Sequence, residues 1–333
     1  MTGVDMIQVA ECNGTRMTHM TLKAAAALAC LVPTTPAPAE SYPERLVTLI
    51  VPYPAGGGTD TAARALARSL SRHWNQSVVV ENVAGADGLI GTQKMLRANP
   101  DGYTLLVPAS QAVLWKTTNP KVMIDLQKDF RLVTKIGDSA QALSVNSKFP
   151  AESIGDLAAL CRKQNCALGS GTMYSEIMGR HLMSLAGVEL SAVVPYKGTL
   201  PMLTDVMGGH IQMGIAPVAA ALAYKESGLL KSLAVLSKDR DQAMPSVQTS
   251  VEQGYPVSAN GWYALVAARD IPQHAFDAIS NAVQSLAQDG ALRDAIIASG
   301  SRPVFSTPEA FASDLQREID DLGPVLATYA PRN

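Results

Sequence analysis

The stretch from Leu46 to Asp60 constrains the fold more than any other part of the chain. Its first six residues, Leu46 to Val51, form a nearly continuous apolar run, which is typical of a strand buried on both faces. The triplet Gly56-Gly57-Gly58 follows, and a helical pattern begins directly after it. Glycine lets the backbone approach a ligand closely, and the start of a helix leaves N–H groups unpaired. The sequence therefore predicts a strand–turn–helix unit suited to holding a small anion.

Apolar strands and helical stripes alternate after this unit. Ala62, Leu66, Leu70 and Trp74 recur every four residues, which indicates a helix. Strands are expected at 77–80 and 104–107, with a helix at 88–98 between them. This βαβαβ order implies a parallel sheet with right-handed crossovers.

A second set of alternating elements begins near Ser139. The elements expected there are helices at 153–161, 173–185 and 199–207, strands at 167–169, 192–195, 211–215 and 233–236, and then helices at 273–287, 291–299 and from Pro308. Two such sets predict an α/β fold of two lobes with a ligand cleft between them, because open α/β sheets bind ligands beyond the carboxyl ends of their strands. We assign 42–140 plus 262–333 to lobe 1 and 141–261 to lobe 2.

The N-terminus has the layout of an export signal. Lys23 precedes a short apolar core from Ala24 to Val32, and Ala37-Pro38-Ala39 provides a cleavage site before Glu40. Residues 1–39 are therefore expected to be a leader and signal peptide, which places the mature protein in the periplasm. The alternatives are a short buried helix, and a true start at Met17 or Met20.

Four cysteines occur in the chain, and two of them, Cys12 and Cys30, would leave with the leader. Cys161 and Cys166 remain, and in an oxidising compartment we expect them to form a disulfide. On a continuous helix the two residues would point about 140° apart, so the bond requires the helix to end near Cys161. Two unreacted thiols are the simpler alternative, and a metal or redox site is weaker because no second Cys/His pair accompanies them.

Composition and missing motifs exclude several classes of protein. The net charge is −2 with no basic run, which argues against a nucleic-acid partner. The P-loop pattern, the G-x-S-x-G elbow and paired histidines at metal-binding spacing are all missing from the sequence. We therefore expect no catalytic residues, no cofactor and no metal site. An enzyme assembled from scattered residues is the weakest alternative.

A series of motifs carries a family resemblance. These motifs are Pro52 to Asp60, Val80-Glu81-Asn82 with Gly85, Gly88 and Gly91, Pro100 to Leu106, Lys128-Asp129-Phe130, Val194 to Gly198, and Asp205 with Gly208-Gly209. In this order they resemble the Bug-type periplasmic solute-binding proteins of tripartite tricarboxylate transporters, from about Tyr42 to the C-terminus. The resemblance implies a periplasmic-binding-protein fold (type II-like), capture of a small carboxylate, and delivery to the permease subunits of the membrane transporter. We expect a monomer, and a carboxylate sensor is the alternative role.

The resemblance also implies the site residues. The loop after the first strand would hold the carboxylate, and Asp60 is expected to organise this loop or a water molecule. The loop before the 199–207 helix would line the cleft from the other lobe, and Lys197 is as compatible with a solvated turn as with ligand contact. The complete predicted ligand set is Tyr53, Ala55, Gly56, Gly57, Asp60, Ser110, Thr172, Tyr174, Ser175, Tyr196, Lys197, Gly198 and Pro217.

The chain departs from the family pattern at the start of the second-lobe helix. Family members commonly carry a histidine after a G-x-G-T segment, and here Glu176 stands at about that position. The segment Gly169 to Thr172 still offers hydroxyl groups at a helix start. This departure leaves the identity of the carboxylate open.

Overall fold

The computed structural model describes residues 41–115, 124–225, 227–299 and 301–329. The leader predicted for residues 1–39 lies outside the described residues. The strands are β1 (Val47–Val51), β2 (Val78–Asn82), β3 (Thr104–Leu106), β4 (Phe130–Asn146), β5 (Ala167–Ser170), β6 (Ala192–Pro195), β7 (Met213–Pro217), β8 (Leu230–Val235), β9 (Asn260–Ala268) and β10 (Arg302–Pro303). The helices are α1 (Gly58–Trp74), α2 (Leu89–Leu96), α4 (Ile154–Cys161), α5 (Met173–Leu185), α6 (Thr199–Gly208), α7 (Val218–Lys225), α8 (Gln273–Ser285), α9 (Gly290–Ala298) and α10 (Pro308–Tyr329), with short 3-10 turns at Ala86–Gly88, Ser110–Leu114 and Leu286–Gln288.

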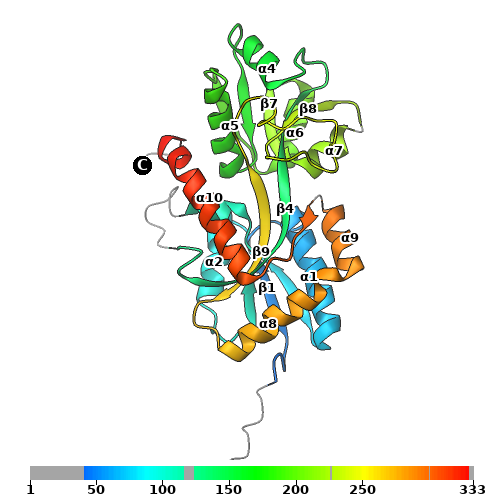
Figure 1. Ribbon diagram of the computed structural model, residues 1–333, viewed down its shortest axis with the longest axis vertical. Coiled ribbons are helices and arrows are strands. Elements are labelled where there is room, and N and C mark those ends of the chain that lie inside the picture. Colours follow the sequence, from blue (N-terminus) through cyan, green and yellow to red (C-terminus); the bar gives the residue numbers. More distant parts are fainter. Residues whose placement is uncertain (1–40, 116–123, 226, 300, 330–333) are drawn as a thin grey trace, which may run out of the picture. The chain divides into compact units, whose positions relative to one another are not determined.

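Within the described residues the strands form one sheet, in the order β2-β1-β3-β9-β4-β7-β5-β6, with β8 and β10 also paired to β4. β1 pairs in parallel with β2 and β3, as the βαβαβ pattern predicts. β5 pairs in parallel with β6 and β7. The antiparallel strands β4 and β9 join these two parallel groups and run through the centre of the molecule (Figure 1).

The change of partners along β4 divides the sheet into two halves. From Phe130 to Ala140 the strand pairs with β9, and from Gln141 to Val145 it pairs with β7. We use "first half" for β1–β3, β9, β10 and β4 up to Ala140, with α1, α2, α8 and α9. The "second half" is β4 from Gln141, β5–β8 and α4–α7.

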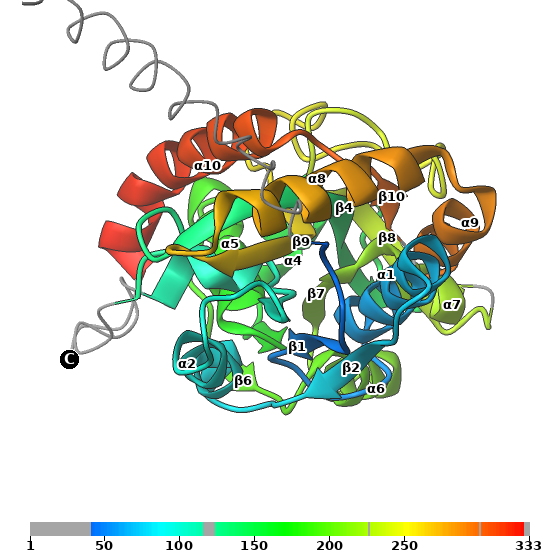
Figure 2. The same ribbon diagram turned by 90° about the horizontal axis from the view of Figure 1, so that it is seen from below.

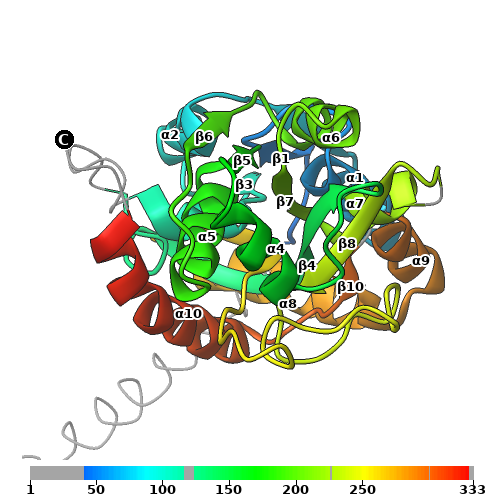
Figure 3. The same ribbon diagram turned by 90° about the horizontal axis from the view of Figure 1, so that it is seen from above.

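Each half is a sheet covered by helices on both faces. In the first half, Val47, Leu49 and Val51 of β1 pack with α1 and α8, whereas Ile50 packs with α2; α1 and α2 accordingly lie on either side of β1 (Figure 2). In the second half, α4 and α5 pack on one face and α6 and α7 on the other, as Figure 3 shows for α5 and α6 around β5 and β7. This layering explains why β1 reads as a continuous apolar run.

Helix α10 contacts both halves. Phe311 and Leu315 near its start pack with β1 and β9 in the first half. Leu322 and Leu326 near its end pack with α5 in the second half. Pro324 lies inside the helix between Leu322 and Leu326, and a proline there removes one main-chain hydrogen bond.

Local sequence signals set several helix ends. Ser153 caps α4 by accepting a hydrogen bond from Asp156 N at 3.0 Å. Thr307 accepts from Ala310 N at the start of α10. α4 ends at Cys161, and Cys161 and Cys166 form a disulfide with a Cα–Cα distance of 5.3 Å. Among the helices of the described chain, none is long and apolar enough to cross a membrane.

Candidate ligand-binding site

The start of α1 presents unpaired N–H groups. Its N-cap residue is Gly57, whose missing side chain provides no cap hydrogen bond. Gly56 has φ +84°, a left-handed conformation that favours glycine. Thr59, in the first turn of α1, is buried. This helix end therefore directs N–H groups and partial positive charge at the space before it.

Asp60 turns inward and braces the loop. One carboxylate oxygen, Oδ2, accepts a hydrogen bond from Gly56 N at 2.9 Å, and the other accepts from Asn82 Nδ2 at 2.9 Å. Arg64 Nε lies 3.0 Å from Oδ1 as an ion pair. Burial acts to raise the pKa of Asp60, but the hydrogen bonds from Arg64, Gly56 and Asn82 outweigh it and lower the pKa below its ordinary value. The hydrogen bond from Gly56 N ties Asp60 to the loop before α1.

The starts of α5 and α6 lie beside each other in the second half. Thr172 caps α5 in a reciprocal box, since its Oγ1 accepts from Ser175 N at 3.1 Å while Ser175 Oγ accepts from Thr172 N at 3.2 Å. Gly198, with φ +109°, is the N-cap of α6 and lacks a side-chain cap. A Cβ at Gly171 would lie 2.9 Å from the Gly198 carbonyl carbon, so glycine is what allows the two loops to approach.

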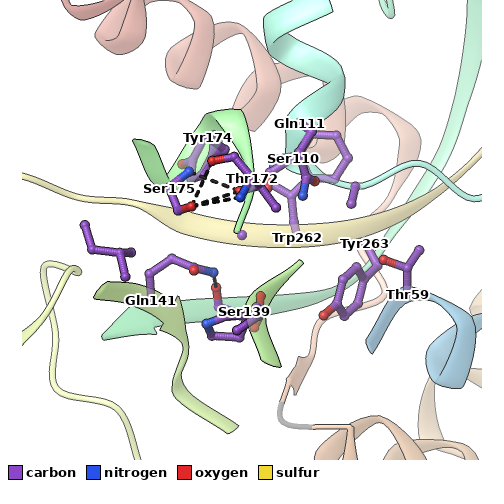
Figure 4. A pocket seen from close by; sticks show the side chains of 15 residues that line it. Thr59, Ser110, Gln111, Ser139, Gln141, Thr172, Tyr174, Ser175, Trp262 and Tyr263 are labelled. Carbon is purple, nitrogen blue, oxygen red and sulfur yellow. Dashed lines mark hydrogen bonds between the residues drawn. The ribbon is translucent and has the colours of Figure 1, made fainter. Parts of the chain in front are cut away.

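A cavity of about 100 Å³ lies where these three helix starts converge. From the first half it is lined by Thr59, Ala109, Ser110, Gln111, Ser139, Gly261, Trp262 and Tyr263, and from the second half by Gln141, Thr172, Tyr174, Ser175, Thr199, Ile215 and Pro217. Figure 4 shows Thr172, Tyr174 and Ser175 grouped at one end and Thr59 and Tyr263 at the other. Residues from both halves of the sheet thus enclose a single space.

The lining is polar but carries no formal charge. Ten of the fifteen lining residues have hydroxyl or amide side chains, and none of the described lining residues is Lys, Arg, His, Asp or Glu. The helix starts add partial positive charge, so the cavity suits an anion bound by neutral donors. The described residues also contain no group of three or more His, Cys, Asp or Glu placed to hold a metal ion.

Two lining side chains have polar atoms without a partner. The Ser139 hydroxyl is buried near the Tyr263 phenol, yet it makes no hydrogen bond of normal geometry to any described residue. Gln111 Oε1 is also buried and unpaired within the described chain. Because buried polar atoms are nearly always hydrogen-bonded, these two atoms are open to a further hydrogen bond in the cavity.

The cavity brings together part of the predicted set. Ser110, Thr172, Tyr174, Ser175 and Pro217 line it. The remaining predicted residues do not line it: the exposed loop residues Ala55, Gly56 and Gly57, the braced Asp60, and the residues Tyr53, Tyr196, Lys197 and Gly198.

These outer residues support the site or lie at its edge. The Tyr53 hydroxyl accepts from Ala109 N at 3.2 Å. The Tyr196 hydroxyl donates a hydrogen bond to Asp205 at 2.6 Å. Desolvation is the main reason that the pKa of Tyr196 rises to about 12, and the nearby Asp205 raises this pKa further. Lys197 is exposed. Glu176, at the departure from the family pattern, pairs with Arg180 at 2.9 Å on α5 and does not line the cavity.

Sequence reasoning missed a second part of the lining. Thr59 follows the glycine triplet directly, and Thr199 follows the predicted residue Gly198. Both could have been found by extending the predicted loops by one residue into the helices that follow them. Ser139, Trp262 and Tyr263 lie on β4 and β9, two strands that the sequence pattern did not reveal. A Cβ at Gly261 would lie 3.0 Å from Gln141 Nε2 and 3.1 Å from the Ser139 carbonyl oxygen, so glycine leaves room for the Gln141 amide in the lining.

Comparison with known proteins identifies the family. The model of the tripartite tricarboxylate transporter family receptor matches residues 62–328. This protein belongs to that family. The protein BugT of Bordetella pertussis is 33% identical over 291 residues, which cover 85% of this chain and 89% of BugT. The resemblance inferred from the motifs is therefore confirmed.

Related structures confirm the fold class. The Rhodopseudomonas palustris protein Rpa4515, solved with adipate, is 27% identical with a TM-score of 0.78, covering 86% of this chain and 98% of Rpa4515. MatC from the same species, solved with malate, is 25% identical with a TM-score of 0.76, covering 86% of this chain and 100% of MatC. As a family member this chain is a two-lobed α/β solute-binding protein of the periplasmic type.

Proposed function

We propose that this protein captures a small dicarboxylate in the cavity between its two halves and delivers it to the permease of a tripartite tricarboxylate-type transporter. The observation that carries the proposal is the convergence of the α1, α5 and α6 starts on one uncharged, hydroxyl-lined space. Helix starts favour anions, and they face the cavity from both halves. The adipate and malate found in the related structures are anions of this class.

The two lobes of this proposal are 42–140 plus 262–333 and 141–261. The partner change of β4 at Ala140 and Gln141 supports the first boundary. Closure of the lobes would be stabilised by contacts that a solute completes only in the shut state. A monomer that closes in this way needs no second copy for its site, since both walls of the cavity come from one chain.

A thermal-shift screen tests the proposal. Adipate and malate are tested beside their uncharged diamides, because a ligand that binds only the folded state raises the melting temperature. We expect at least one dicarboxylate to raise it and the matched diamide to leave it unchanged. Equal shifts for acid and amide, or no shift with any acid of a wider carboxylate panel, would contradict anion capture. Loss of uptake of the same acid in cells lacking this protein then tests delivery to the permease.

A further inference from the structure

Glu318 of α10 places a buried carboxyl group directly behind the cavity. Its Oε2 accepts a hydrogen bond at 2.6 Å from Nε1 of Trp262, and Trp262 is a lining residue. The other oxygen, Oε1, is buried and has no hydrogen-bond partner of normal geometry among the described residues. A potential negative charge is therefore one side chain away from the space that the proposed anion occupies.

Among the described residues, no cation forms an ion pair with Glu318. Lys135 on β4 is the nearby base, but its ammonium is already paired with Asp138 at 3.3 Å and with Asp314 at 3.1 Å. On α5, the Tyr174 hydroxyl lies near Glu318, and burial together with this carboxyl raises the pKa of Tyr174. Asp138 also pairs with Arg302, and Asp314 also pairs with Arg317. This ion cluster therefore has one more positive than negative charge, but the two arginines are exposed and each of its three cations is paired with a carboxylate other than Glu318. The other groups near Glu318 are one neutral phenol and one indole.

This environment favours the neutral acid. Burial raises the pKa of Glu318 to about 7; the Trp262 hydrogen bond and Lys135 lower it, while Asp138 and Asp314 raise it. The protonated group can still accept from Trp262 through one oxygen, and its O–H can donate towards Tyr174. Both forms therefore hold the indole, but only the ionised form repels an anion in the cavity.

We propose that Glu318 is a positioning residue of the ligand site, and that its protonation tightens the binding of an anionic solute. This inference rests on the proposed function, because it requires the solute to be an anion. By linkage, a solute that binds the protonated protein better also draws a proton onto it. The placement of α10 gives a structural reason for this role. The helix contacts both halves, and Glu318 lies between the residues of α10 that contact the first half and those that contact the second half.

The first measurement is the affinity for adipate and malate by calorimetry at about pH 6 and about pH 8, where carboxylates of ordinary pKa stay ionised. We expect the wild-type affinity to fall about fivefold to tenfold over this range. Glu318→Gln keeps an acceptor for Trp262 without the charge, so it should bind with the low-pH affinity at both values. Glu309→Gln is the matched control, because Glu309 is an exposed carboxylate in the first turn of the same helix, and it should keep the wild-type pH dependence.

The second measurement needs no ligand. The indole N–H resonance of Trp262, identified by its loss in Trp262→Phe, should titrate with a midpoint near pH 7 and should not titrate in Glu318→Gln. An indole signal that is constant across this range overturns the inference.

The remaining outcomes separate the two proposals. Wild-type affinity that does not change with pH, or a pH dependence that persists in Glu318→Gln, overturns the inference while leaving anion capture intact. Failure of both acids to bind at either pH overturns it together with the dicarboxylate form of the proposed function.

Discussion

At the scale of single residues, Gly58 leaves room for the Tyr263 ring that lines the cavity. It is the first residue of α1, and a Cβ there would lie 2.2 Å from the Tyr263 hydroxyl. Tyr263 is buried and lines the cavity, so its ring cannot move without changing the site. The sequence singled out the glycine triplet for backbone approach to a ligand, and the structure adds packing against Tyr263 as a further reason for glycine at its third position.

Replacement of Gly58 by alanine tests this role. We expect Gly58→Ala to weaken carboxylate binding at least tenfold, which corresponds to about 1.4 kcal/mol, because the displaced phenol disturbs the cavity. Gly290→Ala is the control, since Gly290 starts α9 and a Cβ there meets nothing within 4 Å. Calorimetry with the acid identified by the screen measures both. Equal affinities in the two variants would show that Tyr263 does not shape the site.

At the scale of elements, local patterns predicted much of the fold. The four-residue stripe from Ala62 to Trp74 corresponds to α1, and the helices expected at 153–161 and from Pro308 correspond to α4 and α10. These signals succeed because they depend on neighbours along the chain. Thr172 and Ser175 were included in the predicted site because they stand at the start of a predicted helix.

The two central strands could not be predicted in the same way. β4 pairs with different strands along its length, and its register with β9 shifts between Leu132 and Thr134 and again between Lys135 and Gly137. Each shift breaks the alternation of inward and outward residues by which a strand is recognised. Trp262 and Tyr263 depend on this long-range pairing, so the aromatic part of the cavity stayed hidden.

The disulfide after α4 gives a prediction at this scale. Cys161 ends the helix and Cys166 directly precedes β5, so the bond closes a short loop between two elements. Chain entropy gives roughly 2 kcal/mol for such a loop. We expect the protein purified without reductant to show no thiol labelling at these two residues after unfolding, and the Cys161→Ala, Cys166→Ala double variant to lose about this stability. Two labelled thiols per mature chain would contradict the bond.

At the scale of the whole molecule, Glu318 links stability to pH. Its pKa rises from 4.5 to about 7 on folding, chiefly because of burial, so the folded protein binds more protons than the unfolded chain between these values. The contribution of Glu318 to stability therefore falls as the pH rises through this interval. The shift corresponds to on the order of 3 kcal/mol between about pH 4.5 and 8.

Denaturant unfolding of wild type and Glu318→Gln at several pH values measures this effect. We expect the difference in stability between the two proteins to move in favour of the variant as the pH rises from about 5 to about 8, because glutamine carries no charge to bury. A difference that stays constant over this range would mean that Glu318 does not titrate there.

In the proposed function, the two halves of the molecule share one ligand. The start of α1 comes from the first half and the starts of α5 and α6 from the second, and the lining between them is uncharged in the described chain. A dicarboxylate held in this way contacts both halves through neutral donors, which is why its binding would favour the closed arrangement.

A crystal structure with the bound dicarboxylate tests this claim most directly. We expect carboxylate oxygens within about 2.7–3.2 Å of backbone N–H or hydroxyl groups at Thr59 in the first half and at Thr172 to Ser175 in the second. An acid bound outside this cavity, or one held by lysine or arginine side chains instead of the helix starts, would contradict the account.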